Sequence, residues 1–238
     1  MSFLTATDGD TGGGGDPDPP ESVPDTANLQ SYYAADEIDA IGGQTVNMWP
    51  DGAGSFDATD DGSPPVYRTG EINGLPAVDF AGDAYLDTGY RHDTDGPWSL
   101  YAVARVDNTG GTNHVYGAQS GDNRAYTGID AGEWRAGYGD TLNQGGTATE
   151  GEYFLVSFVA GSGTVELFAN GGSEVTGSYT PLGGQSHNHL IGAFTNDAGV
   201  PGEYWGGEVA EILRYGVEHD STTRQDVELY LNGKYGIF

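Results

Sequence analysis

The stretch from Glu203 to Phe238 constrains the fold of this chain more than any other. Its first half alternates apolar and polar side chains, as expected of a β-strand, in which every second residue shares a face. The alternation predicts two faces, one with Val209, Leu213 and Tyr215 and the other with Ala210 and Ile212.

The second half of this stretch changes to the spacing of an α-helix. Val227 and Leu231 lie four residues apart on the same helical face. We expect Ser221 or Thr222 to cap the start of this helix, and Gly233 stands where a C-cap is expected. The chain therefore closes with one strand and one short helix.

The rest of the chain is typical of short strands joined by tight turns. Gly contributes 41 of 238 residues and helical periods are few, which favours one all-β domain plus an appendage. Residues 96–108 are the strongest strand, and residues 152–177 predict a hairpin that turns at 161–163. Their inward faces are predicted to carry Trp98, Leu100, Ala102, Ala104, Val106, Phe154, Val156 and Phe158.

Three segments together resemble laminin-G-like, concanavalin A-like domains of the lectin and glucanase kind. They are LQSYYAAD at 29–36, NGLPAVDFAGDAYL at 73–86, and GEVAEILRY followed by the helix ending in KYGI at 207–237. The resemblance covers residues 28–238. It implies a two-sheet antiparallel jelly-roll sandwich with a short C-terminal helix, and it leaves function open because such domains occur in many proteins.

The charge balance is extreme for a folded domain. Asp and Glu number 36 against 8 Lys and Arg, giving a net charge of -28, and Lys234 is the only lysine. Such self-repulsion is screened at molar salt, so the composition indicates a protein of a salt-loving organism. Nucleic acid is an unfavourable partner because no basic patch is visible.

The sequence also limits the other classes of site. Cysteine is absent, which excludes disulfides and thiolate metal sites. No run is long and apolar enough to span a membrane, and no secretion signal is recognisable.

Residues 1–25 differ from the rest in composition. Gly, Pro and Asp dominate, so this segment cannot build a core of its own. We expect an extended arm that anchors the chain in an assembly through Phe3 and Leu4, with the sandwich formed by residues 26–238.

One acidic pair invites a hydrolase interpretation. Glu37 and Asp39 stand two residues apart, as do the catalytic acids of some glycosidases built on concanavalin A-like folds. A third acid is missing, because Ile41 and Gly42 occupy its place. The sequence therefore favours a protein that is not an enzyme.

Oxygen-rich loop pairs suit calcium, which is the one cofactor we expect to be compatible with the chain. The pairs singled out are Asp93 with Asp95 and Asn196 with Asp197; Asp60 with Asp61 is a further pair. No EF-hand spacing is present, and an acidic surface produces such pairs by chance. His187 and His189 are a weaker metal candidate, since no further ligand accompanies them.

Aromatic side chains near turns are candidates for stacking on sugar rings. The expected exposed set is Tyr126, Trp134, Tyr138, Tyr204 and Trp205, although core packing explains most of them equally well.

The sequence thus predicts a non-enzymatic structural and adhesion module. The preferred setting is the surface of a virion of a salt-loving archaeal virus, as a turret, spike or tail-fibre head. It would form homo-oligomers, contact other virion proteins through the arm and bind host-surface glycans. A secreted or cell-surface lectin is the alternative, and a glycan-processing enzyme is a third.

Overall fold

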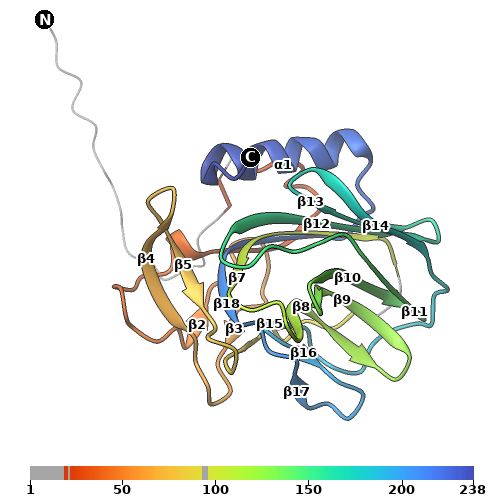
Figure 1. The fold of residues 1–238 in the computed structure, drawn as a ribbon, viewed down its shortest axis with the longest axis horizontal. Helices are drawn as coiled ribbons and strands as arrows, with labels where there is room; N and C mark the ends of the chain where they lie inside the picture. The colour runs from red at the N-terminus through yellow and green to blue at the C-terminus, as the bar shows by residue number, and fades with distance from the viewer. Residues whose placement is uncertain (1–18, 21, 93–95) are drawn as a thin grey trace, which may run out of the picture.

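The computed structural model describes residues 19–20, 22–92 and 96–238 and shows a sandwich of two β-sheets with one helix on the outside (Figure 1). Phe3 and Leu4, predicted to anchor the arm, lie outside the described residues. The all-β sandwich and the short C-terminal helix predicted from the sequence are confirmed.

The first sheet has the order β14-β13-β12-β7-β18-β5-β4, and β1 pairs with β18 next to β5. All its pairings are antiparallel. Its strands are β1 (Leu29–Ala34), β4 (Val66–Ile72), β5 (Leu75–Asp79), β7 (Trp98–Val106), β12 (Tyr153–Gly161), β13 (Thr164–Ala169), β14 (Gly172–Ser178) and β18 (Gly207–Tyr215).

The second sheet has the order β11-β10-β9-β8-β15-β6-β3-β2, with β16 and β17 beside β8. The one parallel pairing among its described strands joins β16 to β8. Its strands are β2 (Met48–Trp49), β3 (Ala58–Thr59), β6 (Leu86–Asp87), β8 (Thr112–Ser120), β9 (Asn123–Asp130), β10 (Glu133–Gly139), β11 (Thr141–Gly145), β15 (Leu190–Ile191), β16 (Phe194–Thr195) and β17 (Pro201–Gly202).

The main core lies between the sheets. Every inward residue predicted for 96–108 and for the hairpin belongs to it, because alternation places those side chains on one face of β7 and β12. The apolar run from Leu190 to Phe194 does not form one continuous strand; it forms two short strands, β15 and β16, with Gly192 between them at a φ of 80°. A Cβ at this glycine would lie 2.1 Å from the Phe80 ring, so the chain must bend there without a side chain.

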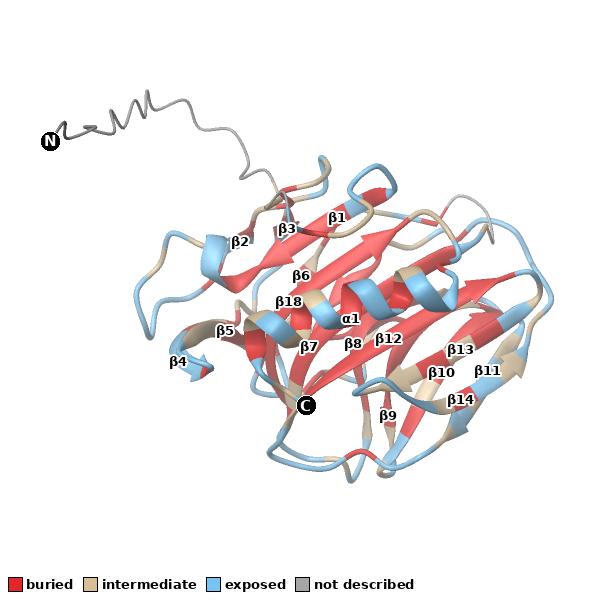
Figure 2. Cartoon of the chain, turned by 90° about the horizontal axis from the view of Figure 1, so that it is seen from above, coloured by how far each residue is buried: buried red, intermediate tan, exposed pale blue. Residues whose placement is uncertain are grey.

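A second core lies between the first sheet and α1 (Ser221–Tyr235), which crosses its outer face (Figure 2). The helix begins one or two residues earlier than predicted, since the N-cap is Asp220 and not Ser221 or Thr222. The Asp220 carboxylate accepts from the Thr223 amide at 2.8 Å. It also runs through Gly233 and ends at Gly236, whose φ of 66° provides the left-handed cap. No helix among the described residues has the length and apolar character needed to cross a bilayer.

Some side chains of β18 were predicted on the wrong face of the strand. Val209 and Ile212 face the inner core, while Ala210, Leu213 and Tyr215 face the helix. The cause is a β-bulge opposite β7 between Val209 and Glu211, which adds one residue and exchanges the faces beyond it. As a result Arg214 points inward.

Part of the segment assigned to the arm packs on the sandwich. Val23 is buried against the outer core, and the Tyr215 hydroxyl donates to the Pro24 carbonyl at 2.9 Å. Asp25 Oδ2 lies 3.2 Å from His219 Nε2. The sandwich therefore includes at least residues 23–25.

Candidate functional site

A cavity of about 530 Å³ opens at one end of the sandwich, and we call it the end pocket. β1, β7 and β18 of the first sheet and the loops after β2 and β6 each supply part of its wall. The side chains used below are Gln30, Phe56, Tyr90, His92, Trp98 and Arg214.

Arg214 is the charged group among the described residues of this wall, and its side chain is almost fully buried. Its guanidinium carbon lies 3.6 Å from the centre of the Tyr90 ring, which is cation–π distance. It donates to Gln30 Oε1 at 2.5 Å and to Ser31 Oγ at 3.1 Å. Its Nε is buried without a hydrogen-bond partner among the described residues.

His92 links the pocket to the inner core. The Tyr138 hydroxyl donates its hydrogen to the Gly96 carbonyl, so it accepts from His92 Nε2–H, whose nitrogen lies 3.2 Å away. The other ring nitrogen of His92, Nδ1, then accepts from the Tyr90 hydroxyl at 3.0 Å. Burial, helped by the positive charge of Arg214, lowers the pKa of His92 to about 4. The imidazole is therefore neutral at pH 7.

Asp51 holds the rim of the pocket in place. Its fully buried carboxylate accepts from the backbone amides of Tyr32, Ala53 and Phe56 at 2.8, 3.2 and 3.4 Å. Burial raises the pKa of this carboxyl, although the three amides oppose that change. These hydrogen bonds fix the loop between β2 and β3 to β1. They also place Phe56 at the pocket, with its ring centre 5.4 Å from that of Tyr90.

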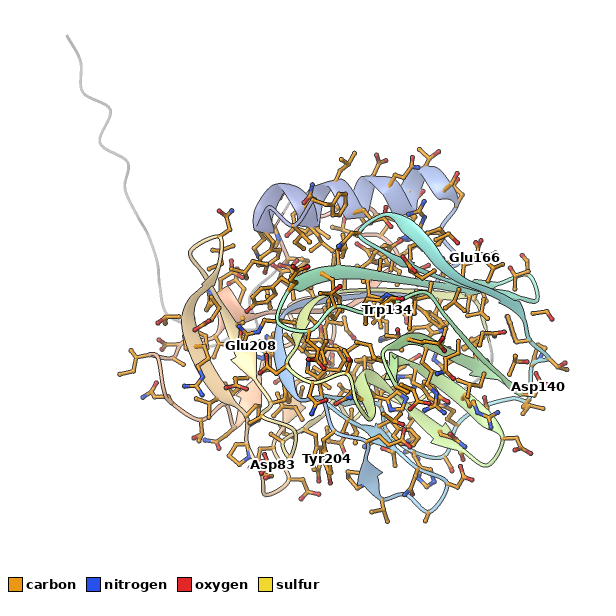
Figure 3. The ribbon with its side chains drawn as sticks, viewed as in Figure 1. Asp83, Trp134, Asp140, Glu166, Tyr204 and Glu208 are labelled. Carbon is orange, nitrogen blue, oxygen red and sulfur yellow. The ribbon has the colours of Figure 1, made fainter. Side chains whose placement is uncertain are left out.

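Four of the five aromatic residues predicted to be exposed are buried. Trp134, Tyr138 and Trp205 belong to the core between the sheets, and Tyr126 packs against His114 and Phe194. Burying such large apolar rings stabilises the fold more than exposing them, so their place near turns was a misleading signal. In Figure 3 Trp134 lies within the sandwich and Tyr204 lies at its margin.

Tyr204 alone of this set is partly exposed. Its ring centre lies 6.2 Å from that of Tyr85. Tyr85 lines a polar groove of about 280 Å³, and Tyr204 lines another of about 360 Å³. Both grooves are smaller than the end pocket, and no arginine lines either of them in the part of the chain that the structure describes.

Of the calcium ligands singled out from the sequence, Asn196 and Asp197 lie within the described ranges. No group of three or more His, Asp or Glu side chains there could hold a metal ion. Asn196 Oδ1 instead accepts from the amides of Ala198 and Val200 at 2.9 and 3.1 Å, and Asp197 is exposed. Asp93 and Asp95 lie outside the described residues.

The two histidines of the weaker metal candidate occupy different environments. His189 is fully buried and donates to Gln185 Oε1 at 2.9 Å, whereas His187 lies partly exposed near Asp197. Burial lowers the pKa of His189 well below its ordinary value.

Glu37 and Asp39 do not share the face of a strand. Glu37 ends the short 3-10 helix η1 (Ala35–Glu37), and both side chains are exposed beyond β1. The geometry that the hydrolase interpretation requires is therefore absent at this pair.

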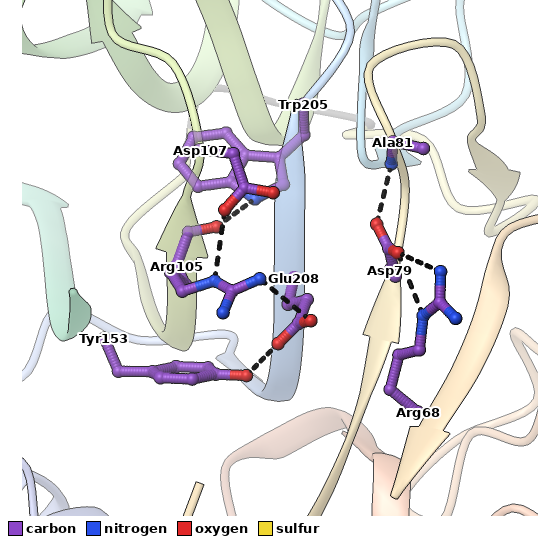
Figure 4. Close-up of polar contacts among 8 residues, drawn as sticks. All are labelled: Arg68, Asp79, Ala81, Arg105, Asp107, Tyr153, Trp205 and Glu208. Carbon is purple, nitrogen blue, oxygen red and sulfur yellow. Dashed lines mark hydrogen bonds and ion pairs between the residues drawn. The ribbon is translucent and has the colours of Figure 1, made fainter. Parts of the chain in front are cut away.

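Two neighbouring carboxylates on the outer face of the first sheet, Glu208 and Asp79, lie closer to the paired arrangement than Glu37 and Asp39 do. Glu208 on β18 accepts from Arg105 at 3.0 Å and from the Tyr153 hydroxyl, while its cross-strand neighbour Asp79 accepts from Arg68 at 2.8 Å (Figure 4). Burial raises the pKa of Glu208. Each carboxylate is held by its own arginine, which is the arrangement of a cross-strand ion ladder.

The motifs that carry the family resemblance meet at another outer cluster. Lys234 Nζ lies 2.9 Å from Asp36 Oδ1 and 2.7 Å from Glu211 Oε2, and the Tyr235 hydroxyl donates to Glu211 at 2.8 Å. These residues come from the opening motif, the closing strand and the closing helix. Their contacts fix α1 to β1 and β18, so the motifs describe the fold and not a binding site.

No protein-family model and no curated protein sequence matches the chain. Solved structures match it in fold. Trypanosoma rangeli sialidase aligns with a TM-score of 0.54 and 20% identity over 89% of this chain, which spans only 34% of that protein.

Two further structures match over most of the chain. Domain 4 of AbnA, a GH43 extracellular arabinanase from Geobacillus stearothermophilus solved with arabinotriose, has a TM-score of 0.58 and 12% identity, covering 84% of this chain and 98% of that one. The binding domain of botulinum neurotoxin serotype D has a TM-score of 0.57 and 10% identity, covering 88% and 51%. At these identities the likeness concerns the β-sandwich fold.

Proposed function

We propose that this domain binds a carbohydrate in the end pocket. The observation that carries the proposal is the composition of its wall, where the rings of Phe56, Tyr90 and Trp98 stand beside the hydrogen-bonding groups of Gln30 and Arg214. A volume of about 530 Å³ lies in the usual range for small-ligand sites, about 300–1,000 Å³. Sugars present apolar ring faces edged by hydroxyls, which this wall complements.

The fold comparisons support the same class of ligand. The AbnA domain was solved with arabinotriose, and it aligns over nearly its whole length with this chain. We further propose that binding is not followed by cleavage. None of the described residues that line the end pocket is an Asp or Glu, so these residues present no pair of carboxylates to a bound sugar.

The test is the binding of oligosaccharides by the full chain, with Phe56→Ala as the variant and Leu142→Ala as its control. Both side chains are 37% exposed, but Leu142 lies on β11. Loss of one stacking ring should weaken affinity about fivefold, corresponding to about 1 kcal/mol. Titration calorimetry should show that loss for Phe56→Ala and none for Leu142→Ala. An unchanged Phe56→Ala affinity would place the ligand elsewhere.

A narrower biological setting is also proposed, as a virion surface module of a salt-loving archaeal virus with the segment before Val23 as the assembly anchor, since residues 23–25 pack on the sandwich. It rests on the sequence: a net charge of -28, one lysine, and a Gly- and Pro-rich first segment. A free lectin of the cell surface would bind glycans equally well. Deleting residues 1–22 distinguishes the virion module from the free lectin. A virion module without this segment should no longer be incorporated into particles, while its glycan affinity is retained.

A further inference from the structure

The arginine and lysine side chains of this chain differ in whether a carboxylate neutralises them. Among the described residues, five of the eight form ion pairs with carboxylates: Arg68, Arg105, Arg135, Arg224 and Lys234. Arg91 is exposed and Arg124 partly exposed, and both donate to backbone carbonyls. Arg214 is therefore the cation that is buried without an ion pair to any described residue, in a protein with 36 carboxylate side chains.

The contacts of Arg214 leave part of its guanidinium available. A guanidinium has five N–H donors, and the bonds to Gln30 and Ser31 use two of them. Both acceptors are neutral, and Nε–H has none. A buried charge held only by neutral groups is costly, because these replace only part of its lost hydration.

Asp51 does not supply the missing anion. Its field reaches Arg214, but its two oxygens already accept three backbone amides, and it forms no ion pair with the guanidinium. Among the described residues no carboxylate forms an ion pair with Arg214, and the cavity that it lines offers a ligand a place beside it.

We propose that the end pocket selects sugars that carry a carboxylate, and that Arg214 is the residue that selects them. This inference rests on the proposed carbohydrate-binding function. The planar guanidinium matches a carboxylate in shape, with two parallel N–H donors. The overall charge of -28 repels anions, so any preference for acidic sugars must come from this local cation and not from the surface.

Two substitutions isolate the guanidinium. Arg214→Met removes the charge while keeping much of the side-chain volume, and replacing a buried ion by an apolar group is often neutral or stabilising. Gln30→Glu places a carboxylate of the chain itself against Arg214 Nη1, where it competes with the ligand. Gln30→Met is the matched control, because it loses the same amide without adding a charge.

The experiment is a glycan array of neutral, carboxylated and sulfated oligosaccharides, probed with the full chain in about 0.1 M and about 1 M KCl. The wild type should retain the carboxylated glycans at both salt concentrations. Arg214→Met and Gln30→Glu should lose them by about tenfold or more, as expected for a charged hydrogen bond. Gln30→Met removes a hydrogen-bonding group of the pocket wall, so it should weaken the binding of neutral and carboxylated glycans alike while the preference for carboxylated ones stays. Thermal melts check that all variants fold.

The outcomes separate the two proposals. Absence of binding to any glycan would overturn the proposed function itself. Equal binding of neutral glycans, preference for sulfated ones, or an acidic preference that survives in both Arg214→Met and Gln30→Glu would overturn the assignment of Arg214 while leaving carbohydrate binding intact.

Discussion

Two stacked histidines lie at the end pocket, His92 in its wall and His189 behind it. His92 and His189 have ring centres 5.7 Å apart with nearly parallel planes, and Trp98 contacts both. Burial lowers the pKa of each, so both rings are neutral in the folded protein at pH 7. They fill the core as aromatic groups and supply hydrogen bonds without adding charge beside Arg214.

This arrangement predicts a loss of stability in mild acid. In the unfolded chain a histidine takes up a proton near its ordinary pKa of 6.5, whereas folded His92 does so only near pH 4. Its contribution to stability is therefore present above 6.5 and is lost as the pH falls from 6.5 towards 4. Between pH 7 and 5 the wild type should lose about 2 kcal/mol more than His92→Gln.

Urea titrations at several pH values measure this difference. The variant also loses two hydrogen bonds, which changes its stability at pH 7 as well, so the slopes against pH are compared and not the absolute values. Equal slopes would show that folded His92 is protonated as easily as a solvated histidine.

At the scale of elements, α1 is held to the sandwich by apolar packing and by one polar cluster. Val227, Leu231 and Tyr235 pack on the outer face of the first sheet. Beneath them Glu211 is fully buried, and its carboxylate accepts from Lys234 and Tyr235. Burial raises the pKa of Glu211, and Lys234 opposes that change.

Lys234→Met should destabilise the protein by about 3 kcal/mol, because it leaves a buried carboxylate without its cation. Arg68→Met is the matched control, since it breaks an ion pair whose arginine side chain is 44% exposed and should cost less than about 1 kcal/mol. Adding Glu211→Gln to Lys234→Met should restore much of the loss. Denaturant unfolding measures all four proteins, and a cost for Lys234→Met no larger than the control would contradict the role of the cluster.

At the scale of the whole molecule, the charge is concentrated on the surface. The inner core is apolar, and most of the few cations are already paired with carboxylates, so the remaining acidic groups repel one another across the surface. Salt shortens the reach of this repulsion, from about 10 Å at 0.1 M to about 3 Å at 1 M.

The melting temperature should therefore rise steeply with KCl up to molar concentrations. NaCl should act similarly, because screening depends on ionic strength and not on the cation. Differential scanning calorimetry measures both series. A melting temperature that stays flat would show that the acidic surface does not limit stability and would remove the argument for a salt-loving source.

The alternation of side chains along a strand predicted the buried face correctly wherever the strand has no β-bulge on that face. The inward faces of β7 and β12 were predictable because alternation alone decides them. Alternation failed at β18, where a bulge at Ala210 exchanges the faces and turns Arg214 into the sandwich. This bulge forms where β18 pairs with β7, which lies about a hundred residues away in the sequence, so the sequence around Ala210 does not predict it.

The sequence by itself determined the fold class, the single closing helix and the acidic surface, because each follows from local spacing or from composition. Only the tertiary structure decided which aromatic side chains are available to a ligand. Phe56 and Tyr90 reach the end pocket from separate loops, while Trp134 and Trp205, equally close to turns, are enclosed between the sheets. Burial depends on which strands cover a residue, and that is set by pairing across the whole chain.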